Sequence, residues 1–279
     1  IEIKSWQIEQ AITMFNSLNS TGMPLSDADI ISAHLFSHAS NKDEFKGIWE
    51  PIIQSADKLA QNKIINIDNV LQQFMYINRS KERQYSEGEL TTPGVRKYYT
   101  VLYPELLETP DALCDQFSKI LLIWDKIQSY SIVKLMMKFN ENFKLFLISY
   151  LFRIPENEIT ESNITPIVEC LLRLFALLEV GDYGYSSRYF KTFLFNENFK
   201  LVDEAYKIEG ILEDFNKHIS STWKEDDVLA DLMEYDKNIL VYLNEYLYAK
   251  EHKIPFDFTP EKVNVEHIMP ASGHNIESV

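Results

Sequence analysis

Glu266 and His267 stand side by side in VNVEHIMPAS, Val263 to Ser272, after a β-branched run. Neighbouring side chains on a strand point to opposite faces, but at a strand end that opens into a turn both can reach a metal ion or a phosphate. Neutral imidazole can take a proton from water near pH 7, and a carboxylate can hold a divalent cation. The pair is therefore a candidate hydrolytic centre, but the composition alone favours a surface histidine at a domain edge.

His34 and His38 form a second candidate, because histidines four residues apart on a helix can bind zinc. The glutamate of a zincin motif is missing, and no third ligand stands nearby. A packed or solvent-facing helix face therefore explains these residues better than a zinc hydrolase site.

LNSTGMPLS contains Asn19 and Gly22, whose turn amides could hold a ligand. A structural interpretation accounts for every residue of this stretch: Gly22 closes one helix in the left-handed conformation, and Ser26 caps the next. Asp29 then stands at the third helical position and completes a variant of the capping box.

The composition is that of an acidic chain with long helices. Of 279 residues, 46% are apolar, and only 8 Gly and 10 Pro occur, which disfavours a loop-rich or β-rich fold. Cys114 and Cys170 each lie in an apolar helical pattern, so we expect buried thiols, as in a reducing cytoplasm. No apolar run is long enough to span a membrane.

The net charge of −15 repels phosphate backbones, so most of the chain is not expected to form a nucleic-acid groove. The densest basic group is Arg79, Lys81 and Arg83. Because Glu82 interrupts it, we expect a solvated loop there.

Apolar periodicity predicts helices along most of the chain, beginning with a helix–turn–helix within the first 40 residues. Start signals occur at Asp68, Thr109-Pro110, Thr165-Pro166 and Ser220 to Thr222. Strand patterns occur only at 1–4 and 262–265. The further predicted helices are 43–60, 66–79, 92–107, 110–128, 131–152, 160–180, 184–195, 200–219, 225–234 and 236–250.

The hexapeptide FNENFK occurs twice, at Phe139–Lys144 and Phe195–Lys200. Two copies could mark a duplicated helical hairpin. The flanking sequences differ, which favours chance or a shared local turn.

Two stretches together resemble a known family. FNSLNSTGMPLSDADI, Phe15 to Ile30, resembles the F-x-x-x-N-x-x-G-x-x-L-S-x-x-D segment of GmrSD-type modification-dependent restriction endonucleases. VNVEHIMP, Val263 to Pro270, resembles the E-H-I-x-P opening of that family's C-terminal nuclease domain. The two motifs occur in the family's order, separated by a helical region.

The resemblance implies a ParB-like N-terminal domain that senses and hydrolyses a nucleotide, and a C-terminal HNH (ββα-metal) domain that cuts DNA in anti-phage defence. His267 would be the general base, and Glu266 a ligand or orienter of one divalent ion, Mg²⁺ or Mn²⁺. The family's D-G-Q-Q-R motif and the later ligands of the nuclease are not found in the chain. We therefore expect a fragment that is inactive alone and that binds neither metal nor nucleotide.

The expected fold is mainly α, with a short strand at the N-terminus and the first strand of a truncated HNH domain at the C-terminus. Residues 1–40 would be the tail of the sensor domain, 41–254 a helical domain, and 255–279 a linker and the start of the nuclease. A cytoplasmic protein is expected, with DNA and the other domains of the parent protein as partners, and with an oligomer possible. The alternative is a non-enzymatic, acidic helical protein-interaction module.

Overall fold

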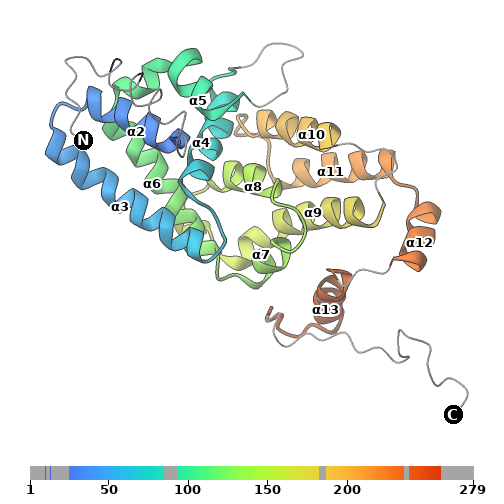
Figure 1. The fold of residues 1–279 in the computed structure, drawn as a ribbon. Helices are drawn as coiled ribbons and strands as arrows, with labels where there is room; N and C mark the ends of the chain where they lie inside the picture. The colour runs from blue at the N-terminus through green and yellow to red at the C-terminus, as the bar shows by residue number, and fades with distance from the viewer. Residues whose placement is uncertain are drawn as a thin grey trace, which may run out of the picture.

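The computed structural model describes residues 25–84, 93–181, 187–235 and 239–258, together with Gln10 and Thr13. Within these ranges the chain is helical and contains no strand (Figure 1). The α-helices are α2 (Asp27–His38), α3 (Lys42–Gln61), α4 (Ile67–Lys81), α5 (Val95–Lys97), α6 (Pro110–Ile127), α7 (Ser131–Met136), α8 (Phe143–Leu151), α9 (Glu161–Val180), α10 (Ser187–Lys200), α11 (Ile208–Thr222), α12 (Glu225–Glu234) and α13 (Ile239–His252).

Helices α2, α3, α4 and α6 form the first layer of packed helices, with α3 lying along α6. In α3 the apolar residues recur at helical spacing, so that Phe45, Ile52, Ala56 and Leu59 face the core together. Asn41 begins this helix, because its side chain accepts hydrogen bonds from two amides of the first turn.

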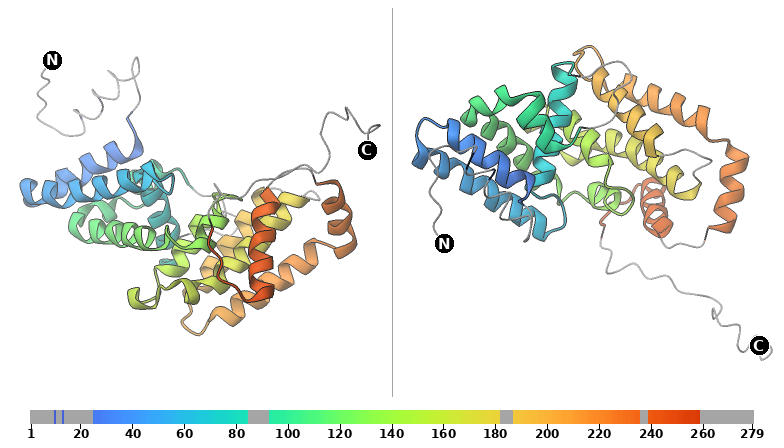
Figure 2. Two further views of the ribbon diagram at one scale, coloured as in Figure 1. Left: turned by 90° about the horizontal axis from the view of Figure 1, so that it is seen from below. Right: turned by 45° about the horizontal axis from the view of Figure 1, so that its top comes forward.

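Helix α4 joins this layer to the helices that follow in the chain. It packs against α6 on one side and against α8 and α10 on the other. The views in Figure 2 agree with this central position. Because α4 has neighbours on several sides, even polar residues in its second half are buried, among them Gln73, Asn78 and Ser80. Each has a partner: the indole Nε1 of the fully buried Trp124, for example, donates to Oε1 of Gln73 over 2.8 Å.

Helices α7 to α11 form the second half of the described chain, around α8 and α9. Helix α8 buries most of its residues, and the inner face of α9 is equally apolar. Helices α12 and α13 lie at the end of the molecule far from α2 and α3 (Figure 1), and α12 buries no residue. Phe258 is buried beside Tyr242 of α13, with ring centroids 5.4 Å apart.

Two predicted helices are broken in the structure. The segment predicted as one helix at 92–107 consists of α5, a π-helical turn η1 (Tyr98–Leu102) and a 3-10 helix η2 (Pro104–Glu108). Tyr103 leaves the helical region because it precedes a proline. The segment predicted at 131–152 is divided into α7 and α8 by a turn in which the side chain of Asn140 accepts from the amide of Asn142.

Two start signals were wrong, and one predicted helix begins later than expected. Helix α9 begins at Glu161 after an N-cap at Thr160, which leaves Pro166 inside the helix. The stretch Ser220 to Thr222 is the end of α11 and caps nothing. The helix predicted at 200–219 begins at Ile208, because residues 201–207 form turns.

The prediction of a solvated basic loop was wrong for Arg79. This residue lies in α4 with 3% of its surface exposed, and its guanidinium carbon lies 4.7 Å from the centroid of the Phe195 ring. This cation–π contact with the ring of Phe195 in α10 offsets part of the cost of burying the charge.

The two copies of FNENFK adopt different structures, so they share no local turn. Phe139–Lys144 includes the turn before α8, whereas Phe195–Lys200 ends α10. What they share is a glutamate–lysine ion pair across three residues, Glu141 with Lys144 and Glu197 with Lys200.

The expected strands at 1–4 and 262–265 lie outside the described residues. The predicted burial of both cysteines is confirmed: each is a free, buried thiol. None of the described helices is long and apolar enough to cross a membrane.

Candidate functional site

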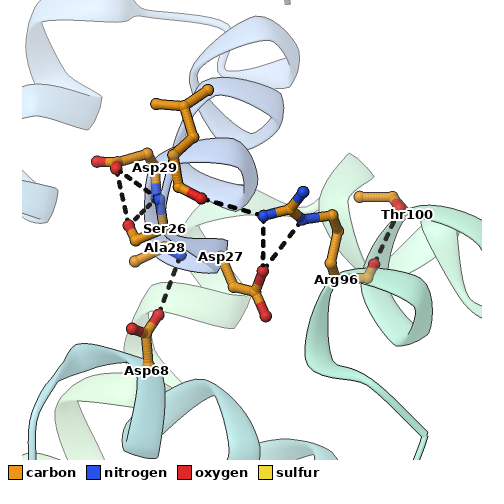
Figure 3. A network of polar contacts seen from close by, with 8 residues as sticks. Ser26, Asp27, Ala28, Asp29, Asp68, Arg96 and Thr100 are labelled. Atoms are coloured by element: carbon orange, nitrogen blue, oxygen red, sulfur yellow. Dashed lines mark hydrogen bonds and ion pairs between the residues drawn. The ribbon is translucent and has the colours of Figure 1, made fainter. Parts of the chain in front are cut away.

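The described half of the first family-like motif forms the start of α2. Asp29 N donates to Oγ of Ser26 over 3.1 Å, and Ser26 N donates to Oδ2 of Asp29 over 3.1 Å. This is the expected capping box, and Figure 3 shows both bonds. Phe15, Asn19 and Gly22, the other three residues of the motif, lie outside the described residues.

The same turn is tied to two other helices (Figure 3). Arg96 of α5 donates from Nε to Oδ1 of Asp27 over 3.0 Å and from Nη2 to the carbonyl of Leu25 over 3.1 Å. The amide of Ala28 donates to Oδ1 of Asp68, at the start of α4, over 3.2 Å. These contacts join residues 40 to 71 positions apart, so they fix the direction in which the chain enters α2.

The start of α2 is therefore occupied by groups of the protein itself. A helix start leaves four amides without partners inside the helix, and an anion could bind them. Here the side chains of Ser26 and Asp68 accept hydrogen bonds from two of these amides. Asp27 and Asp29 add negative charge at the helix start. The motif thus positions a helix and offers no open anion site among its described residues.

The two histidines of α2 are placed differently: His34 is half-buried, whereas His38 is exposed at the last turn. Among the described residues no group of three or more His, Cys, Asp or Glu side chains could hold a metal ion. Glu266 and His267, the predicted metal ligand and general base, lie outside the described residues.

A cavity of about 770 Å³ lies between α9, α11, α12 and α13. Its volume is within the range of small-molecule sites, roughly 300–1,000 Å³. The apolar part of the lining is contributed by all four helices: Leu172, Ala176, Leu177 and Val180 of α9, Leu212, Phe215 and Ile219 of α11, Val228 and Leu232 of α12, and Leu240, Leu243 and Leu247 of α13.

Charged side chains of the lining lie at two places, and Asn244 of α13 adds a neutral polar group. Glu169 of α9 accepts hydrogen bonds from the hydroxyl of Tyr246 and, over 2.6 Å, from Nζ of Lys250. One turn further along α9, Nη1 of Arg173 donates to Oδ1 of Asn216 over 2.6 Å. The charge of Lys250 is thus compensated by a carboxylate, whereas Arg173 donates its hydrogen bond to a neutral amide, that of Asn216.

Cys170, which lies between Glu169 and Arg173 in the sequence of α9, also lines the cavity. Burial, with the nearby carboxylate of Glu169, raises the pKa of its thiol to about 12. The thiol is therefore protonated near pH 7 and is a poor nucleophile, so Cys170 contributes a small apolar surface to the cavity.

A separate polar cluster joins α10 and α11. The hydroxyl oxygen of Tyr206 lies 2.5 Å from Oε2 of Glu197 and 2.5 Å from Oδ2 of Asp214. Nζ of Lys200 bonds both carboxylates, over 2.8 and 2.7 Å. Burial raises the pKa of Tyr206, and the two carboxylates raise it further, so the phenol is a donor at all ordinary pH values.

The apolar residues of α12, of which Val228 and Leu232 line the cavity, are a signal in the sequence that could have indicated it. Helix α12 carries Leu229, Leu232 and Met233, yet all three are exposed, 54%, 40% and 87%. Packing within the chain does not explain why a short helix that buries no residue carries several apolar side chains. The sequence around α12 could not indicate that α9 forms the facing wall, because α9 ends more than forty residues earlier in the chain.

A scan against protein-family models and searches of curated proteins and of solved structures found no match to this chain.

Proposed function

We propose that this chain is part of a modification-dependent DNA restriction endonuclease of the GmrSD type. The observation that carries the proposal is the order of two motifs, the segment Phe15 to Ile30 and the segment Val263 to Pro270, on either side of a helical body. The family interpretation of the N-terminal motif agrees with an ordered role for its described residues, since Ser26 and Asp29 form a capping box.

In this proposal His267 is the general base that removes a proton from the attacking water. Glu266 orients the site or holds one divalent cation, and that cation stabilises the oxygen that leaves the phosphodiester. The helical body, which carries much of the charge of −15, is not the main DNA surface. Its role would be to couple nucleotide-dependent sensing to cleavage, and α4 is suited to this because it contacts helices of both halves.

Restriction in living cells tests the proposal. Cells that express the intact gene product are challenged with phages that carry modified or unmodified DNA, and plating efficiency is measured. We expect reduced plating of the modified phages, lost with His267→Ala and retained with His252→Ala. His252 is a suitable control because it is exposed and bonds only within its own helix, to the carbonyl of Tyr248. Equal protection by both variants would refute the assigned role of His267.

A second candidate function is a non-enzymatic protein-interaction module. The observation that favours it is the apolar surface of the last two described helices, where Leu229, Met233, Leu247 and Tyr248 are each more than half exposed. The same phage challenge separates the two: a module that acts only by binding retains its effect when His267 is replaced by Ala, and loses it when these apolar residues are replaced by polar ones.

A further inference from the structure

The cavity between α9, α11, α12 and α13 has the features of a ligand site, and nothing in the proposed nuclease chemistry uses it. It is about 770 Å³ in volume, and its walls are mostly leucine, valine, alanine and phenylalanine side chains. An apolar ligand would be stabilised because its own apolar surface and that of the cavity are removed from water on binding. The body of a suitable ligand is therefore apolar.

The polar side chains of the lining determine which polar group of a ligand can bind beside them. Among the described residues no ion pair joins Arg173 to a carboxylate. Its guanidinium donates a hydrogen bond to the side-chain oxygen of Asn216. A guanidinium has five N–H donors, of which this bond uses one. Lys250 lies in the same lining, with its charge compensated by Glu169. Arg173 is exposed, so the described lining offers, on its solvent-facing side, one cation without a carboxylate partner, which favours an anionic head that can accept two parallel hydrogen bonds.

We propose that this cavity binds an amphipathic small molecule with an apolar body and a carboxylate head, which Arg173 holds. Asn216 positions the guanidinium, because its side-chain oxygen accepts from Nη1 and leaves the other donors available. A carboxylate suits the guanidinium of Arg173 better than a neutral alcohol does, because only the carboxylate forms an ion pair with it and accepts two parallel hydrogen bonds. This site is independent of the proposed nuclease function, and its chemistry involves no covalent step.

Calorimetric titration of the chain with decanoate and with decanol tests the head and the body separately. Both ligands share one apolar body, so both are expected to bind, with decanoate the tighter. Arg173→Gln is expected to weaken decanoate binding about tenfold, which corresponds to ~1.4 kcal/mol, and to leave decanol unchanged. Arg188→Gln is the matched control, because Arg188 is exposed on α10 and does not line the cavity.

A second pair of variants tests the location. Leu232 lines the cavity, whereas its neighbour Met233 does not and is 87% exposed. Both are exposed enough that glutamate should leave the fold intact, which circular dichroism checks. Leu232→Glu is expected to abolish decanoate binding and to weaken decanol binding, whereas Met233→Glu should change neither. Absence of binding by both ligands, equal losses for the two ligands in Arg173→Gln, or equal effects of the two glutamate variants would each overturn the proposal.

Discussion

Asn198 provides the sharpest test of the packing between α4, α8 and α10. Its side chain is fully buried; Nδ2 donates to the carbonyl of Tyr76 over 3.0 Å, and Oδ1 accepts from the hydroxyl of Ser149. Asn142 holds the same place in the other copy of FNENFK, but it is half-buried and its side chain bonds only to its neighbour Asn140. The repeated hexapeptide thus supplies a matched control with identical neighbours in the sequence.

The expected magnitudes follow from these bonds. In Asn198→Ala the hydrogen bond to Tyr76 is lost at about 0.5–1.5 kcal/mol, and the buried hydroxyl of Ser149 loses its acceptor at about 1–3 kcal/mol. The higher helix propensity of alanine offsets about 0.5 kcal/mol of this loss. We therefore expect Asn198→Ala to lower the free energy of unfolding by ~1–4 kcal/mol. Asn142→Ala removes one partly solvated bond and should cost less than ~1 kcal/mol.

Urea unfolding of the two variants, followed by circular dichroism and by tryptophan fluorescence, measures both losses. Equal losses in the two variants, or a loss below ~1 kcal/mol for Asn198→Ala, would refute the view that this asparagine joins three helices.

Three further predictions concern other parts of the structure. Ser26→Ala should lower the free energy of unfolding by ~1 kcal/mol, because the cap of α2 loses its side-chain acceptor, and Ser26→Asp should restore most of it; thermal denaturation measures both. Partial burial would raise the pKa of Asp214, but hydrogen bonds from a lysine and from Tyr206 outweigh it and hold this pKa below 3.8. The resulting stability is present above the unfolded-state pKa and is lost as the pH falls through the lower folded-state value. Unfolding curves below about pH 4 should therefore show a steeper acid loss in the wild type than in Asp214→Asn, and equal slopes would contradict this. Burial raises the pKa of the thiols of Cys114 and Cys170 to about 12, so both should resist maleimide at pH 7 in the folded protein and react in denaturant, as a mass spectrometer would show.

The helices that the sequence predicted well are those whose ends are decided by nearby residues. Helix α12 has the predicted bounds, 225–234, because three acidic residues begin it and its apolar spacing is short and regular. Helix α6 begins at the predicted Pro110, where a proline is favoured in the first turn. Such signals act within one turn, so they can be read without knowledge of the fold.

The errors arose where distant residues decide the structure. Arg79 is buried because Phe195, more than a hundred positions away, covers its guanidinium. The same six residues form a turn before α8 and the end of α10, because in the second copy Asn198 is held by α4 and α8. Local pattern cannot distinguish these cases.

The candidate sites also differ in whether nearby or distant residues form them. The capping box of Ser26 and Asp29 was predicted because both partners lie three residues apart. The cavity was missed because its four helices meet only in the folded chain, and the polar contact of Arg173 with Asn216 spans 43 positions. The pair Glu266 and His267 remains a prediction based on the motif.

Metal-dependent cleavage of modified DNA by the intact gene product tests the central claim most directly. The purified protein is mixed with nucleotide, Mg²⁺ or Mn²⁺, and matched modified and unmodified DNA, and the cut fraction is measured on a gel. We expect cleavage of the modified DNA alone, abolished by chelation of the metal and by His267→Ala, and retained by His252→Ala. Cleavage that persists in His267→Ala, or that needs no divalent cation, would contradict the proposed nuclease.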